Sequence, residues 1–171
     1  SNPVSLAYSQ TADRLFVANQ APYDYGLGNF DTSLAFGGLE IVDLSDKSTT
    51  LIADEDLGGY VERVVTGDGK LFAVISQMDS ATFQFSSQIY SMDDSNEELS
   101  GLEVFLDNSS DVRDIEVDSQ NRLWVSRRAI SAADGSASNP KVDVFTISSG
   151  DKVGDSLAPV VPVTSIAIGE I

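Results

Sequence analysis

One pattern recurs along the chain of 171 residues, and it constrains the fold more than any other feature. Each copy contains an alternating apolar run, a polar turn, a basic residue, a leucine, an aromatic residue and a second apolar run. The leucines are Leu15, Leu71 and Leu123, which are 56 and 52 residues apart. Residues 163–168 match the first apolar run of the third copy, and a fourth copy is therefore expected to begin there. Self-similarity at this period indicates an array of supersecondary units.

Within each copy, apolar residues alternate with polar or small ones, which is the period of a β-strand. The turns between the first two strands are rich in residues that tolerate a positive φ. They occupy residues 10–13, 66–69 and 118–121. A third strand is predicted over residues 39–44, 87–92 and 141–147, and a fourth over residues 48–53, 102–106 and 156–162. No segment of ten or more residues has a convincing helical period, and the sequence therefore predicts an all-β chain.

Four-stranded antiparallel units repeated at about 50 residues are typical of the blades of a β-propeller. We therefore expect a single partial propeller domain over residues 1–171. Its three blades are predicted over residues 4–54, 61–107 and 112–162, with an extra strand over residues 163–171. An antiparallel sandwich whose hairpins are similar by coincidence is the alternative.

Short motifs carry a resemblance to known propeller repeats. Residues 14–19 (RLFVAN) followed by residues 38–44 (GLEIVDL) resemble the YVTN-type repeat, and residues 118–125 (DSQNRLWV) resemble the matching hairpin of the NHL-type repeat. The second copy departs most, because residues 73–76 read AVIS where the asparagine would fall. The resemblance covers nearly the whole chain as repeats and is more specific for a propeller than for one family.

Three blades do not make a ring, because propellers usually close with 4–8 blades. We expect either a fragment of a longer propeller or two copies that complete a ring of about six blades. A last strand that joins a blade already counted is the third arrangement. The fragment is favoured, since the chain begins without Met and stops within a repeat.

The charge and composition exclude several classes of function. Lys and Arg total 10 against 27 Asp and Glu, which gives a net charge of −17, and there is no His and no Cys. Disulfides, thiol catalysis, Ser-His-Asp triads and imidazole metal ligands are therefore excluded. The acidity argues against nucleic acid as a partner, and no apolar run is long enough for membrane insertion. We interpret the chain as an exported bacterial protein, periplasmic or extracellular, with an acidic solvated surface.

Long connections between the second and third strands are where a rigid scaffold usually carries its function. They are predicted over residues 20–37, 77–86 and 127–140. The first combines aromatic, carboxylate and amide side chains, which suit a protein or glycan partner, although its aromatic residues could instead pack the loop down as a cover. The predicted ligand-binding residues are Tyr23, Asp24, Tyr25, Asn29, Asp31, Arg127 and Arg128.

An enzymatic alternative rests on similarity to metal-dependent sugar-lactonase propellers, whose metal ligands are carboxylate and amide oxygens and need no His. That resemblance implies a divalent cation such as Ca²⁺ in the channel, held by Asn19, Glu62 and Asp114 and activating water. Without such a metal site, we expect the opposed charges at the start of the first strand of each copy to form structural ion pairs. They are Glu62 and Arg63 in the second copy and Asp111, Arg113 and Asp114 in the third.

An acidic run over residues 93–98 invites a calcium-loop interpretation. Counted from Asp94, the run lacks the glycine that an EF-hand loop needs at its sixth position. The twelfth position is Phe105, where an EF-hand loop requires a glutamate. A solvated turn is the better interpretation. The sequence thus favours a non-enzymatic propeller segment that acts as a scaffold or binding module.

Overall fold

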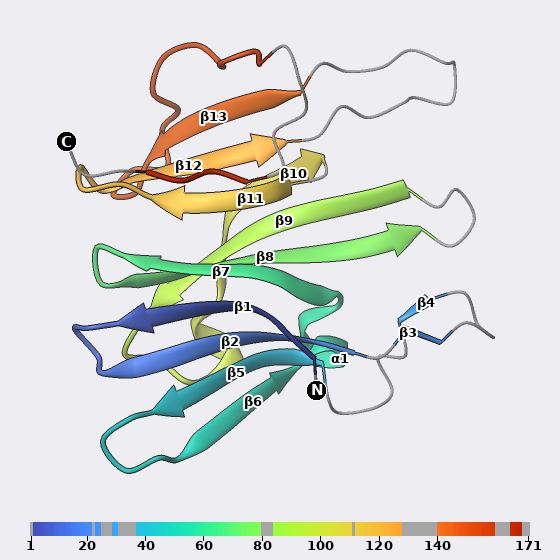
Figure 1. The fold of residues 1–171 in the computed structure, drawn as a ribbon, viewed down its shortest axis with the longest axis vertical. Helices are drawn as coiled ribbons and strands as arrows, with labels where there is room; N and C mark the ends of the chain where they lie inside the picture. Colours follow the sequence, from blue (N-terminus) through green and yellow to red (C-terminus); the bar gives the residue numbers. More distant parts are fainter. Residues whose placement is uncertain are drawn as a thin grey trace.

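The structure is a computed structural model, and it contains three antiparallel β-sheets stacked one after another (Figure 1). The residues that it describes are 2–21, 23–24, 29–30, 37–79, 84–110, 112–127, 140–159 and 165–168. In each sheet the strands pair in chain order, except that β3 and β4 lie between β2 and β5 in the sequence and pair with each other. The prediction of an all-β chain of antiparallel sheets is confirmed.

The first sheet has the order β1-β2-β5-β6. Its strands are β1 (Asn2–Ser9), β2 (Arg14–Gln20), β5 (Gly38–Asp43) and β6 (Thr49–Ala53). Between β2 and β5, a two-residue ladder joins β3 (Tyr23–Asp24) to β4 (Asn29–Phe30). The short helix α1 (Asp54–Leu57) follows β6 and ends at Gly58, whose positive φ of 67° suits a glycine. Four residues are too few for an amphipathic period, and the sequence pattern did not predict this helix.

The second sheet has the order β10-β9-β8-β7. Its strands are β7 (Tyr60–Gly67), β8 (Lys70–Asp79), β9 (Gln84–Asp93) and β10 (Glu103–Ser110), and the 3₁₀ helix η1 (Leu99–Gly101) precedes β10. The expected long loop over residues 77–86 is wrong, because the β8–β9 ladder continues to the pair Asp79 and Gln84. The residues there are polar or mixed, and they lack the apolar alternation that marks a half-buried strand.

The third sheet has the order β11-β12-β13, with strands β11 (Val112–Val117), β12 (Arg122–Arg127) and β13 (Lys141–Thr146). Of the predicted fourth strand over residues 156–162, residues 160–162 lie outside the described residues. Up to residue 159, the described chain pairs with β13 through isolated bridges, of Leu157 with Val142 and of Lys152 with Phe145, so the pairing begins before the predicted segment.

The three sheets share one register. Leu15, Leu71 and Leu123 lie opposite the second-to-last or last residue of the preceding strand, and the turn before each of them contains a non-glycine residue with positive φ. These residues are Asp13, Asp68 and Asn121, as the turn composition predicted. The first strand of each sheet also has a register shift, and it falls just before Ser5, Arg63 and Asp114. Ser5, Arg63 and Asp114 therefore occupy equivalent positions.

Two apolar cores lie between the sheets. One joins the first sheet to the second and contains Phe16, Leu39 and Leu71, and the other joins the second to the third and contains Phe72 and Leu123. Alternation along β8 sends Leu71 to one core and Phe72 to the other. The middle sheet is therefore covered on both faces, whereas each sheet of a two-layer sandwich is covered on one.

The equivalent positions next to the register shifts connect each sheet to the next one. The backbone N–H of Val64 donates to Ser5 Oγ at 3.1 Å, and Arg63 Nε lies 3.5 Å from Asp114 Oδ1. The backbone N–H of Ile166 donates to Asp114 Oδ2 at 2.7 Å, in the same sense as Val64 to Ser5. The segment 165–168 thus lies beside β11, although it is not assigned as a strand.

Candidate functional site

The ends of β2, β8 and β12 lie at one side of the stacked sheets, and the β3–β4 hairpin lies at that side as well (Figure 1). The hairpin brings four residues of the first predicted binding loop together through the pairs Tyr23 with Phe30 and Asp24 with Asn29. Their side chains are outside the described part of the structure. The other predicted ligand-binding residues of this group, Tyr25, Asp31 and Arg128, also lie outside the described residues.

Arg127 lies at the same side, at the end of β12, and is paired within the third sheet. Its Nε is 3.1 Å from Asp143 Oδ2, but the N–H makes no hydrogen bond with the described residues, so the pair is one of charge. Lys152 Nζ lies 2.8 Å from Asp143 Oδ1, and the Ser156 hydroxyl donates to the same oxygen at 2.6 Å. Burial alone would raise the pKa of Asp143, but the contacts to Lys152, Ser156 and Arg127 lower it overall. Arg127, which the sequence analysis predicts to bind a ligand, therefore has a structural partner in Asp143.

The three residues predicted for a metal under the enzymatic alternative each have separate partners. Asn19 Nδ2 donates to Glu40 Oε2 at 2.7 Å. Glu62 Oε2 accepts a hydrogen bond from Ser76 Oγ at 2.7 Å. Asp114 accepts the N–H of Ile166 and faces Arg63. In the described part of the chain, no group of three or more acidic side chains is placed to hold a metal ion.

The opposed charges at the start of the first strands do form an ion pair between Arg63 of β7 and Asp114 of β11. Arg63 Nη1 also donates to the backbone carbonyl of Glu62 at 2.7 Å. Arg113 lies on β11, and Asp111 is outside the described residues. The expectation of structural ion pairs is confirmed for Arg63 and Asp114.

Asp54, which sequence reasoning missed, is a buried acid next to Gly37, the residue that follows the segment 22–36. Its residue is 2% exposed, and neither carboxylate oxygen has a hydrogen-bond partner among the described residues. A Cβ on Gly37 would lie 2.0 Å from Asp54 Oδ2, so only glycine fits under this carboxylate. Ala21 and Gly37, the residues that flank the segment 22–36, are both buried at this point.

Burial raises the pKa of Asp54 to about 6. The backbone N–H of Val61 offsets part of this effect, although its geometry falls short of a full hydrogen bond. The acidic triplet of residues 54–56 is visible in the sequence, but nothing in it distinguishes the buried acid from its two exposed neighbours. Asp54 is thus a carboxyl that titrates near neutral pH at the base of the predicted binding loop.

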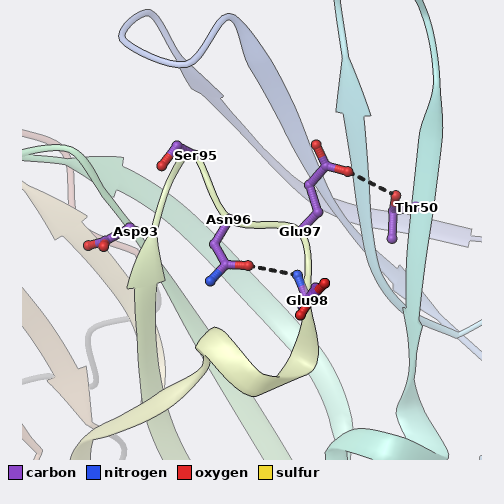
Figure 2. Close-up of a pocket in the computed structure, with 6 residues that line it drawn as sticks. All are labelled: Thr50, Asp93, Ser95, Asn96, Glu97 and Glu98. Atoms are coloured by element: carbon purple, nitrogen blue, oxygen red, sulfur yellow. Dashed lines mark hydrogen bonds between the residues drawn. The ribbon is translucent and has the colours of Figure 1, made fainter.

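The acidic run over residues 93–98 lies at the opposite end of the sheets and borders an open hollow of about 560 Å³. Figure 2 shows Glu97 reaching toward Thr50, whose hydroxyl is 3.4 Å from Glu97 Oε2, while Asn96 Oδ1 accepts the backbone N–H of Glu98. Arg14 pairs with Glu97, which neutralises part of the run. The turn is therefore held by contacts within the protein.

One residue of this run differs from the expectation of a solvated turn. Asp94 is buried and accepts a hydrogen bond from the Ser9 hydroxyl at 2.5 Å, which ties the second sheet to the first. The expectation is correct for Asp93 and Glu98, which are exposed, and wrong for Asp94. The reason is that the neighbouring sheet brings a hydrogen-bond donor to it.

Another buried acid, Asp118, organises the turn between β11 and β12. Burial opposes its ionisation, but hydrogen bonds from the side chains of Arg122 and Trp124 and from two backbone amides lower its pKa to about 2. Asp118 is therefore ionised at neutral pH and has a structural role.

Comparisons with known proteins bear on the fold alone. No family model matches the sequence, and no curated protein matches it. A solved structure of Kuenenia stuttgartiensis hydrazine synthase is similar, with a TM-score of 0.52 and 13% sequence identity. The similarity covers 92% of this chain and 37% of that one. At this identity the likeness concerns the arrangement of strands.

No helix in the described ranges is long and apolar enough to cross a membrane.

Proposed function

We propose that the chain forms three consecutive blades of a β-propeller of the YVTN or NHL kind. We further propose that it acts as a non-enzymatic scaffold or binding module for a protein or glycan partner outside the bacterial cytoplasm. The observation that carries the propeller is the common register of the three sheets, each of which packs on the next through equivalent positions. The neighbouring first strands, β1 beside β7 and β7 beside β11, support the same arrangement.

The proposed binding surface is the side where β2, β8 and β12 end. Loops held by rigid strands are where binding residues concentrate, and Tyr23, Asp24, Asn29 and Arg127 all belong to elements at this side. Tyr and Asn side chains beside carboxylates can stack on and hydrogen-bond to a sugar or a peptide backbone. The lactonase-type alternative needs Asn19, Glu62 and Asp114 to converge on one ion, and their separate partners favour the binding module.

The test is binding of the labelled chain to a glycan array and to a peptide array. A double variant, Tyr23→Ala with Asp24→Ala, alters the hairpin, and Thr11→Ala alters an exposed turn at the opposite end as the matched control. We expect the hairpin variant to lose binding by about tenfold or more and the control to retain it. Binding that survives in the hairpin variant, or no binder on either array, would contradict the proposal.

A thermal melt with and without Ca²⁺ distinguishes the enzymatic alternative from the binding module. A calcium-dependent rise of several degrees that Glu62→Gln abolishes would favour the metal-dependent propeller. We expect melting curves that coincide with and without the ion.

A further inference from the structure

A buried carboxyl lies at the base of the connection that carries the proposed binding residues. Asp54 is 2% exposed, and neither of its carboxylate oxygens has a hydrogen-bond partner among the described residues. An acid in such a place is costly to ionise, because no donor replaces the water that a charged carboxylate loses. The proposed binding module does not use this acid, so its burial calls for a separate explanation.

The backbone at both ends of this connection packs beside Asp54. Ala21 precedes the segment 22–36, Gly37 follows it, and both are buried. A Cβ on Gly37 would lie 2.0 Å from Asp54 Oδ2 and 2.8 Å from the backbone nitrogen of Ala21. The backbone N–H of Asp54 donates to the carbonyl oxygen of Gly37 at 3.2 Å. A change in the position of Asp54 therefore acts directly on the ends of the connection.

The helix α1, which contains Asp54, is a single turn on the same side of the sheets as the β3–β4 hairpin (Figure 1). Its anchor in the first core is Leu57, which is 9% exposed. The backbone N–H of Gly59 donates to the carbonyl oxygen of Asp54 at 3.2 Å. Opening of this one turn breaks few contacts and leaves the strand ladders intact, so α1 is able to open locally.

The charged side chains on the strands packed against α1 have contacts of their own. These strands are β5, β6 and β7. Their titratable residues, all on β5 and β7, are Glu40, Asp43, Tyr60, Glu62 and Arg63. The four charged ones contact, in the same order, Asn19, Arg14, Ser76 and Asp114.

The remaining titratable groups near Asp54 lie on its own helix and on the connection. Glu55 and Asp56 are exposed. In the segment 22–36, the side chains lie outside the described structure, and the titratable residues are Tyr23, Asp24, Tyr25 and Asp31. Burial raises the pKa of Asp54 to about 6, and the backbone of Val61 offsets part of this effect. The ionisation of Asp54 is therefore governed by whether the carboxyl is buried.

We infer that Asp54 is a pH-sensitive latch, which keeps α1 packed against Gly37 and Ala21 while its carboxyl is protonated and lets α1 open more often once it is ionised. The value of such a latch to binding rests on the proposed function of the β3–β4 hairpin. In the closed state the pKa of Asp54 is about 6, and a hydrated carboxyl in the open state has the ordinary value of 3.8. The open population therefore rises as the pH rises through this window, by about tenfold from pH 5 to pH 8.

The experiment is native-state hydrogen exchange of the full chain, followed by NMR between about pH 5 and pH 8. The backbone amides of Asp54 and Gly59 report on α1, and each rate is divided by the rate of an unstructured amide at the same pH. We expect their protection to fall by about tenfold over this range. The amide of Leu102, which donates to the Leu99 carbonyl in η1, is the internal control with constant protection. Constant protection in α1 as well overturns the inference.

Urea at low concentration separates local opening from global unfolding. Local opening exposes little surface, so the protection of the α1 amides should not change with urea, whereas the protection of the β8–β9 ladder should fall. An equal dependence on urea in α1 and in the ladder overturns the latch, because α1 would then open only when the whole chain unfolds.

Variants identify the carboxyl as the cause. Asp54→Asn cannot ionise, so its α1 protection should not change with pH, and Asp56→Asn, at an exposed acid of the same helix, should keep the tenfold fall. Gly37→Ala places a methyl group against Asp54 Oδ2 and displaces the carboxyl, which should lower α1 protection at pH 5 and remove its pH dependence. Gly69→Ala meets no neighbouring atom and is the control for it. A tenfold fall that persists in Asp54→Asn or Gly37→Ala overturns the inference.

The latch and the proposed function fail in different ways. Constant α1 protection in a chain that binds a glycan or peptide through the hairpin overturns the latch alone. A pH-dependent latch in a chain that binds nothing on either array overturns the proposed function alone.

Discussion

Replacing Asp54 by asparagine tests how strongly the fold depends on one buried carboxyl that has no hydrogen-bond partner among the described residues. In the folded chain its pKa is about 6, compared with 3.8 for an exposed aspartate. Between these values the folded state keeps a proton that the unfolded state releases, and stability therefore falls as the pH rises through this window. Each pKa unit corresponds to about 1.4 kcal/mol, so ionised Asp54 costs the folded state about 3 kcal/mol well above pH 6.

Asp54→Asn removes this pH-dependent cost while keeping the size of the side chain. The cost in the wild type is about 2 kcal/mol at pH 5 and about 3 kcal/mol at pH 8. The difference in free energy of unfolding, variant minus wild type, should therefore increase by about 1 kcal/mol over this range. The buried amide adds a constant desolvation cost, which shifts the difference without changing its slope.

The assay is urea unfolding at constant ionic strength, followed by the fluorescence of Trp124, at several pH values between about 5 and 8. Asp56→Asn is the matched control, because Asp56 belongs to the same helix and is exposed. We expect a flat difference for the control. A flat difference for Asp54→Asn as well would refute the reasoning that burial raises the pKa of this carboxyl.

The remaining predictions concern the turns and the contacts between sheets. Asp118→Asn should destabilise the chain by about 2 kcal/mol at neutral pH, and this cost should shrink as the pH falls from about 4 toward 2, where the wild-type carboxylate gains its proton. Urea unfolding at neutral and acidic pH measures it, and a pH-independent cost would contradict the ionic role. Gly67→Ala should cost about 1–3 kcal/mol, because the new methyl group would lie 2.4 Å from Val117 Cγ1 in the next sheet. Gly69→Ala meets no neighbouring atom and should cost about 1 kcal/mol for its positive φ alone, so equal thermal shifts of the two variants would argue against the close contact between the sheets.

The strands were predictable because their signal is local. Alternation over a few residues, with Asp13, Asp68 and Asn121 in the turns, is decided by neighbours in sequence and by backbone sterics. The extension of β8 and β9 to Asp79 and Gln84 was not predictable in this way. Those residues pair because the adjoining ladder already holds the two strands in register, and their own side chains contribute little to the pattern.

One part of the candidate site could be predicted from the sequence, and another part could not. The loop that contains Tyr23, Asp24 and Asn29 was recognisable from its composition and length. The environment of each acid was not, because it depends on which strand of another repeat comes alongside. Asp94 is buried against Ser9, which is 85 residues earlier in the sequence, and Asp54 is buried over Gly37.

By itself, the sequence determined the all-β class, the repeat and its turns, and the exclusion of His- and Cys-based chemistry, because these follow from composition and from interactions between near neighbours. Only the tertiary structure decided that the middle sheet is covered on both faces, that Arg63 and Asp114 pair across sheets, and that Asp54 has no partner among the described residues. Burial and charge pairing are properties of the space between sheets. That space is set by the packing of residues more than 50 positions apart, which no local pattern records.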